Sequence, residues 1–517
     1  MKDAGHPLRL TMWLRPVAVV GATAMTLFLG PYLLDYLLGG EHLERGLLDM
    51  LFHYDPETVQ NALGNLSQVV VAVLGIVITV VSIVVQLAAN RYTPRIADMF
   101  FRDRNNLTVL GFFVTTCISS LWVSLSVGRE FVPVLSIAIT LALVTFSLLL
   151  MIPYFAYVFN FLDPEHIIGR IQQLSLDAAL RSGVDLGKRQ LAALCGLEQL
   201  CDVAVNAVSN KDKMIAASAV NAIKDLGTSY LRQKAEQPAA WFALGEALRT
   251  NPDFVGLAPE SVEDLARRRT WLEWKLLRQF QAIYSEALRE APDINYLLAI
   301  DTRYLGEAAL AAGDREALSL TVKFFNTFLR LTLNAQNVRT AYNLLHQYRL
   351  LAERVLAAGE AAMVADIGSY LRYYAQVAQG MHLGFVAESI AYDLALLCEQ
   401  AHERRSPAHD ALLQALLSVD QAADDEAQEK TLRGVRKAQL KLACAYLVRG
   451  DEAAARLIYE DMRDERPERL RSLRAEMLSV GARDFWEIID RGTNFDYMDP
   501  MRKEQLQVFF SWFPGLA

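Results

Sequence analysis

Residues 66–89 read LSQVVVAVLGIVITVVSIVVQLAA, and most of what can be predicted for this chain starts from this run. It contains no charged side chain and consists mainly of Val, Leu and Ile. A helix needs about 20 apolar residues to cross the hydrocarbon core of a bilayer, so we predict a membrane span here. Three other stretches meet the same requirement, at 17–38, 107–128 and 132–159. They predict a transmembrane domain of four spans over residues 1–162.

The second predicted span carries a line of small and polar residues at intervals of four, three, four and four. Its members are Gly75, Thr79, Ser82, Gln86 and Asn90. This spacing places them on one face of a helix. Polar groups are costly in hydrocarbon unless they find partners, which leaves two interpretations. The line either packs against other helices or lines a hydrated path in an oligomer.

The third predicted span has a shorter line of hydroxyl residues, Thr116, Ser120 and Ser124. Hydroxyls in membrane helices often bond to their own backbone, so this line is weak evidence for a path. Asp35, near the end of the first span, is the one charged residue within the four spans. A proton relay or a voltage sensor is therefore not predicted.

Loop charges predict the orientation. Seven basic residues precede the first span or join spans two and three, against two, Arg45 and Arg129, in the other loops. The seven are Lys2, Arg9, Arg15, Arg91, Arg95, Arg102 and Arg104. Basic loops stay in the cytosol, so both termini are predicted to be cytoplasmic.

The loop between spans two and three is also the candidate interface segment. Pro94 disfavours helix at Thr93 and removes an amide donor, so the helix should stop here. Arginines at this point meet lipid phosphates on the cytosolic leaflet. The segment is therefore predicted as a membrane-interface anchor, with a gate or a docking point for the soluble part as the alternative. Its residues are Arg91, Tyr92, Thr93, Pro94, Arg95, Arg102, Asp103 and Arg104.

From Ile78 to Thr116 the chain resembles a bacterial family of predicted multi-span inner-membrane proteins of unknown function. The matching features are a span ending in Gln86-Leu87-Ala88, a Tyr92-Thr93-Pro94-Arg95 turn and an Arg102-Asp103-Arg104 stretch. Further on, where the family tends to have Ser-Pro-x-x-Asn-Asp-Pro, this chain has residues 209–212 without the prolines. The resemblance implies an inner-membrane protein and implies no activity.

Composition excludes several classes of protein. Hydrophobic residues make up 53% of the chain, charged residues 21%, and mean hydropathy is +0.18, which excludes a disordered chain. The net charge of −8 argues against nucleic acid as a partner. Five cysteines without a C-x-x-C pair predict neither a disulfide framework nor a zinc site. No G-x-G-x-x-G, H-E-x-x-H or G-x-S-x-G motif occurs, so we predict no enzyme, no catalytic residue, no cofactor and no metal.

The rest of the chain reads as helix. We predict a membrane-proximal helical domain over 163–250 and a repeat domain over 251–517, divided by the proline-bracketed segment NPDFVGLAP at 251–259. In the repeat domain, LAAGD, LAAGE and LVRGD place Gly313, Gly359 and Gly450 at intervals of 46 and 91. The missing copy falls near residue 405. A glycine ending each helix pair predicts an α-solenoid of hairpins with a period of about 45 residues.

Together these features predict an all-α inner-membrane protein that forms a homo-oligomer in the lipid bilayer. We expect a channel-like or transport role, with the cytosolic helices as an assembly or gating domain. The alternative is a membrane-anchored scaffold or receptor that recruits a cytosolic protein through the solenoid, whose concave face suits such a partner.

Overall fold

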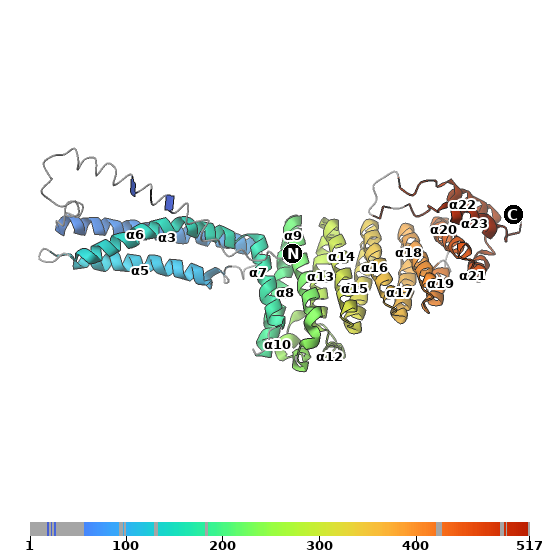
Figure 1. Ribbon diagram of the computed structural model, residues 1–517, viewed down its shortest axis with the longest axis horizontal. Helices are drawn as coiled ribbons and strands as arrows, with labels where there is room; N and C mark the ends of the chain where they lie inside the picture. Colours follow the sequence, from blue (N-terminus) through green and yellow to red (C-terminus); the bar gives the residue numbers. More distant parts are fainter. Residues whose placement is uncertain are drawn as a thin grey trace. The chain divides into compact units, whose positions relative to one another are not determined.

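The computed structural model describes residues 56–91, 100–128, 133–180, 185–419, 426–485 and 494–514, and a few single residues, at 18, 19, 22, 25, 26, 97, 491 and 492. All regular structure in these ranges is helical, which confirms the predicted all-α class. The chain divides into two compact units, Met1–Ile167 and Ile168–Ala517. Figure 1 shows the long helices of the first unit and the stacked helices of the second.

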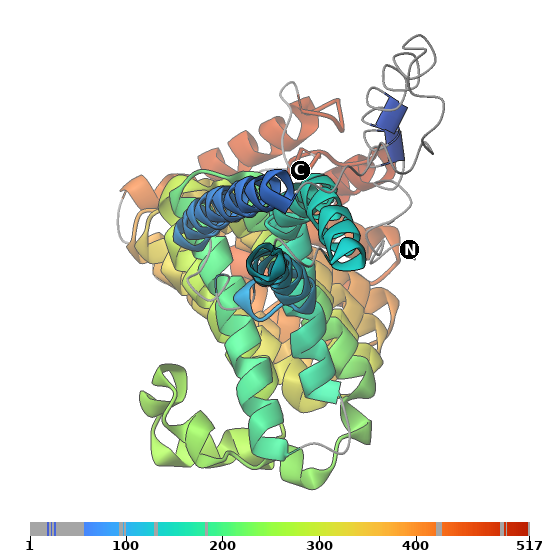
Figure 2. The same ribbon diagram turned by 90° about the vertical axis from the view of Figure 1, so that its left-hand side faces the viewer.

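The first unit contains three long helices, α3 (Pro56–Arg91), α5 (Arg104–Ser126) and α6 (Val134–Phe161). They correspond to the second, third and fourth predicted spans, although α3 begins ten residues earlier than predicted. Successive helices run in opposite directions (Figure 1), and Figure 2 looks at them roughly along their axes. The predicted first span, 17–38, lies almost wholly outside the described residues.

A fourth helix, α8 (Leu186–Ser209), is also long and apolar enough to cross a membrane by length and composition alone. More than half of its most apolar window is buried, against about a fifth for α3, α5 and α6. It packs against α9 (Lys213–Gln233) and α13 (Trp271–Glu290) inside the second unit. Its apolar surface is therefore covered by protein, and we assign it to the helical core of that unit.

The second unit is a stack of helices with a regular turn. It begins with α7 (Pro164–Leu180), α8 and α9, followed by short elements: η1 (Lys234–Glu236), η2 (Ala239–Phe242), α10 (Glu246–Arg249), α11 (Pro252–Val255) and α12 (Pro259–Arg267). Six helices of twenty residues follow: α13, α14 (Pro292–Ala311), α15 (Arg315–Asn334), α16 (Val338–Ala357), α17 (Ala361–Gly380) and α18 (Gly384–Glu403). The stack ends with α19 (His409–Leu417), α20 (Glu426–Val448), α21 (Glu452–Met462), α22 (Pro467–Ser479) and α23 (Pro500–Phe510).

Left-handed residues end these helices at a constant spacing. Their positions are Gly313, Gln336, Gly359, His382, Arg405 and Gly450. The first five are 23 residues apart, so the predicted period of about 45 is two helix-and-turn units. After each, a backbone N–H bonds back to the last helical turn, as in Asp314 N to Ala309 O at 2.9 Å. Arg405 stands where the missing glycine copy was predicted.

Alternate helices form two rows. The helices α14, α16, α18 and α20 contact one another in order, as do α13, α15, α17 and α19. Contacts between successive helices are more extensive within the first row than within the second. Arg491 and residues 494–496 lie across the first row, and α23 packs on α20 with Phe509, Phe510 and Phe513 buried.

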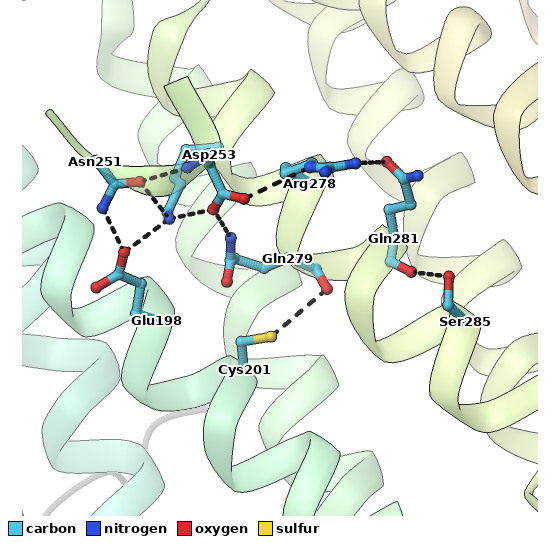
Figure 3. A network of polar contacts seen from close by, with 9 residues as sticks. Glu198, Cys201, Asn251, Asp253, Arg278, Gln279, Gln281 and Ser285 are labelled. Carbon is cyan, nitrogen blue, oxygen red and sulfur yellow. Dashed lines mark hydrogen bonds and ion pairs between the residues drawn. The ribbon is translucent and has the colours of Figure 1, made fainter. Parts of the chain in front are cut away.

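The predicted boundary near residue 250 is bridged by a polar network (Figure 3). The ammonium of Lys275, on α13, donates to Glu198 of α8 at 2.9 Å and to Asp253 of α11. Asn251 also donates to Glu198, at 2.7 Å. Only 1% of the Lys275 side chain is exposed, and two carboxylates compensate its buried charge. This network ties the short elements to both long helices.

The left-handed turns give a test of the repeat. Arg405→Gly removes the steric cost of a side chain at positive φ and should raise the free energy of unfolding by about 0.5–1 kcal/mol. Gly359→Ala introduces that cost and should lower it by about 1 kcal/mol. Denaturant titration of the full chain in detergent, followed by circular dichroism, measures both. Equal stability of the two variants would contradict the assignment of these turns.

Candidate functional site

The predicted polar line on α3 is part of a longer face. At helical spacing upstream of Gly75 lie further polar and small residues, so the face runs the whole length of the helix. We call this set the α3 polar face. It consists of Glu57, Asn61, Gly64, Gln68, Ala72, Gly75, Thr79, Ser82 and Gln86. All are exposed except Gly64 and Ser82, which are half-buried. Asn90 continues the line, but its side chain lies outside the described residues.

The opposite side of α3 is the one that packs against α5 and α6. Its buried residues are Leu63, Ser67, Val70, Val77, Val81, Val85 and Ala88. In a helix with 100° per residue, their direction is more than 90° from that of the α3 polar face. The polar face is therefore turned away from both described neighbours. Any partner of this face must come from outside α5 and α6.

Inside the three-helix bundle, a different set of polar groups is paired across helices. The hydroxyl of Ser67 donates to Ser120 at 2.9 Å, and that of Ser147 to Thr116 at 3.3 Å. Nearer the start of α5, Tyr154 donates to Asn106 at 2.7 Å. Thr116 and Ser120 also bond to their own helix, as predicted, but their role in packing was missed. The signal for it was their i, i+4 spacing on an otherwise apolar helix.

These pairs leave little polar lining inside the bundle. Each pair uses the donor of one side chain and an acceptor of another, which is the favourable way to bury such groups in hydrocarbon. Thr140 is the exception in the bundle, since its buried hydroxyl oxygen has no partner among the described residues. A hydrated path through one bundle is thus not what these contacts provide.

The predicted interface segment is described in part. Residues 92–96 lie outside the described range, as does the side chain of Arg91. Asp103 caps α5 by accepting from the N–H of Asn105 at 3.0 Å and also accepts from Tyr157 at 2.6 Å. Arg102 and Arg104 are exposed beside it. Charged residues here mark the level at which α5 leaves the apolar region.

The Ser67–Ser120 contact fixes the height of the α3 polar face against that level. Because α3 and α5 are antiparallel, Thr79 is level with Thr108, and Gln86 with Phe101. Gln68, Gly75 and Thr79 therefore stand at the depth of the span, whereas Gln86 stands at its charged edge. The face crosses the apolar layer and ends where the arginines begin.

The second unit contains a cavity of about 350 Å³ that sequence reasoning missed. It lies against α16, α18 and α20, where Arg491 and residues 494–497 cross them, and we call it the basic cleft. Five cationic and two acidic side chains line it: Arg349, Lys441, Arg483, Arg491, Arg502, Asp393 and Glu399. His346, Tyr392, Phe495 and Tyr497 are also in the wall. Residues about 150 positions apart in the sequence meet here, so no local sequence pattern indicates this site.

Both acids in the basic cleft are shared between arginines. Asp393 accepts from Arg491 at 2.7 Å and from Arg349 at 3.0 Å, and Glu399 pairs with Arg502 and with Arg449. Burial and the nearby charges of Arg491, Arg349 and Arg303 lower the pKa of His346 to about 4. Burial and Arg502 lower the pKa of Lys441 to about 8. Arg349 and Arg502 also pair with Glu353 and Asp499, so among the described residues Lys441 and Arg483 are the lining cations that no carboxylate pairs with.

Comparison with known proteins supports the membrane assignment. Residues 9–194 match a family model described as "Predicted membrane protein (DUF2254)", which confirms the predicted resemblance. The chain matches no curated protein. A solved structure titled "Circular tandem repeat protein with novel repeat topology and enhanced subunit contact surfaces" is 20% identical, covers 62% of this chain and 80% of its own, and has a TM-score of 0.28.

The buried polar pairs give a test of the bundle. Tyr154→Phe removes the donor to Asn106 and should destabilise the membrane unit by about 0.5–1.5 kcal/mol, the range for hydrogen bonds between membrane helices. Tyr304→Phe, at a phenol in the second unit that is 43% exposed, is the matched control and should change nothing. Unfolding of both variants by titration with SDS measures the difference. Identical curves would mean that the Asn106–Tyr154 bond contributes no stability.

Proposed function

We propose that copies of this membrane protein assemble through the α3 polar face and together form a channel-like or transport pathway. The helical-repeat unit would then serve as the assembly or gating domain. The chain has long apolar helices and matches a family of predicted membrane proteins. The observation that carries the proposal is the direction of the α3 polar face, away from both α5 and α6.

A second copy is the occupant that suits this face. A row of polar groups at the depth of the span is costly against lipid, and an identical row supplies complementary donors and acceptors. Gly64 and Gly75 lie on the row, and a Cβ added at either would meet no atom within 4 Å. Such open, small positions let two helices approach closely.

The same face supports a path between copies rather than within one. The inward polar groups of a single bundle are bonded to one another, and the remaining inward positions of α3 are aliphatic. Several α3 helices around an axis would present Gln68, Thr79 and Gln86 to a common space. Water in that space would satisfy their remaining hydrogen-bonding positions.

We place the repeat unit in the cytosol, on the inner face of a bacterial cell membrane. The support is the excess of basic residues before the first predicted span and between spans two and three. Exposed Arg102 and Arg104 stand at the level where α5 begins, as basic anchors at a cytosolic leaflet do. An even number of spans would put both termini on that side.

Cross-linking tests the assembly. In a Cys117→Ser background, Thr79→Cys places a thiol on the α3 polar face, and Leu107→Cys places one at the same depth on α5, where the side chain is 56% exposed. Oxidation in native membranes should link Thr79→Cys chains into dimers and leave Leu107→Cys chains monomeric. A result without dimers from Thr79→Cys would contradict the proposed contact and would favour residues 17–38 of the same chain as its cover.

Flux measurements test the pathway. Replacing Ser82 and Gln86 by Leu removes polar groups from the cytosolic end of the α3 polar face and should abolish ion or solute flux in proteoliposomes. Leu107→Ala, on the other side of the bundle, should leave flux unchanged. Absence of flux from the wild-type protein under all ionic conditions would rule out the channel-like role while leaving the assembly intact.

The scaffold role is the second candidate, and one surface favours it. Tyr370 and Tyr373 on α17 are 37% and 46% exposed, and Arg330 donates to the Tyr373 hydroxyl at 2.9 Å. Exposed tyrosine beside arginine is typical of protein interfaces. If the protein is a scaffold, we expect no flux in proteoliposomes. We also expect the full-length protein to retain a protein partner that a variant carrying Tyr370→Ala and Tyr373→Ala no longer binds.

A further inference from the structure

We propose that the basic cleft of the repeat unit is a binding site for a small organic phosphate, in which buried arginines hold the phosphate group. The inference does not depend on the channel-like role. It follows from the charge of the cleft, the fixed position of its side chains and its volume. Each of these properties restricts the class of ligand that fits.

Charge comes first. Five cations face the cavity against two carboxylates, and each carboxylate is already engaged by two arginines. Burial, together with the charges of Arg491, Arg349 and Arg303, lowers the pKa of His346 to about 4, so His346 is neutral at physiological pH. A net positive, partly buried site is stable chiefly when an anion joins it.

Arg491, in the wall of the cleft, is held in place by its contacts. Only 3% of the Arg491 side chain is exposed. One amino group donates to the Tyr342 carbonyl at 2.7 Å, the other to Asp393, and the guanidinium lies 4.2 Å from the Tyr342 ring centre. Its Nε is buried and has no hydrogen-bond partner among the described residues. A guanidinium fixed in this way places a positive charge in the wall of the cleft, where it attracts a phosphate.

The volume of the cleft and the aromatic residues in its wall indicate what the rest of the ligand is. About 350 Å³ is at the small end of ligand pockets, which suits one nucleotide-sized molecule and excludes a peptide strand or nucleic acid. The rings of Tyr392 and Phe495 are stacked 4.7 Å apart along one wall, and Tyr497 stands beside them. Aromatic surface next to an anion site favours an organic phosphate over the bare ion.

Lys441 provides a second measurable sign of binding, the uptake of a proton. It donates to the Phe495 carbonyl at 2.9 Å, and the charged groups acting on it are Arg502, Glu399, Asp496 and Asp499. Burial and Arg502 lower its pKa to about 8, so at pH 8 a large fraction of the amine is neutral. An arriving anion favours the ammonium form, and binding should therefore take up a proton.

Calorimetry of the full chain in detergent tests the proposal, with ADP, inorganic pyrophosphate and citrate as separate probes. ADP or pyrophosphate should bind at least tenfold more tightly than citrate, and proton uptake should appear as a dependence of the heat on buffer at pH 8. Lys441→Met should weaken binding at least tenfold and abolish the uptake. Arg483→Gln, at the exposed rim, should weaken it about threefold, whereas Arg456→Gln outside the cleft should have no effect.

A second arm asks whether the phosphate belongs to a lipid, using vesicles with and without phosphatidic acid. Binding to those vesicles alone, lost in Lys441→Met, would keep the phosphate site and assign it to a headgroup. The proposal is overturned if neither phosphate probe nor phosphatidic acid binds, if citrate binds equally well, or if Arg483→Gln and Lys441→Met, with unchanged unfolding curves, bind like wild type.

Discussion

The membrane unit depends on one constraint, that a polar group in hydrocarbon must have a polar partner. Ser67–Ser120, Ser147–Thr116 and Tyr154–Asn106 meet it inside the bundle. These contacts also set the register of the three helices, because a shift by one residue would break all of them. The inward face of α3 is occupied by this packing, and the α3 polar face points away from α5 and α6. The same constraint that fixes the bundle therefore favours the association of several copies of the chain through the α3 polar face.

The second unit follows a different rule, in which one local turn is repeated. A left-handed residue every 23 positions ends a helix and reverses the chain, and the rows of helices follow from that repetition. A regular stack by itself offers only a curved surface. The basic cleft arises where the repetition stops and Arg491 and residues 494–496 return across α16, α18 and α20.

Much of this architecture was predictable because its causes are local. Apolar runs predicted three described helices, and Gly313, Gly359 and Gly450 predicted the hairpins. The finer period was missed because Gln336 and His382 adopt the left-handed conformation without being glycine. The α3 polar face was seen only from Gly75 onward, since Asn61 precedes the predicted span and Gln68 stands at its beginning. The basic cleft joins residues from His346 to Arg502, and only the folded chain brings them together.

Self-association through α3 is the central claim, and particle mass tests it most directly. One chain has a mass of 57.8 kDa. Native mass spectrometry of protein released from nanodiscs should give two or more times that mass for the wild type, shifting to the single-chain mass when Gln68 and Thr79 are replaced by Leu. A wild-type particle containing one chain, at every protein concentration and in every lipid composition tried, would contradict the account.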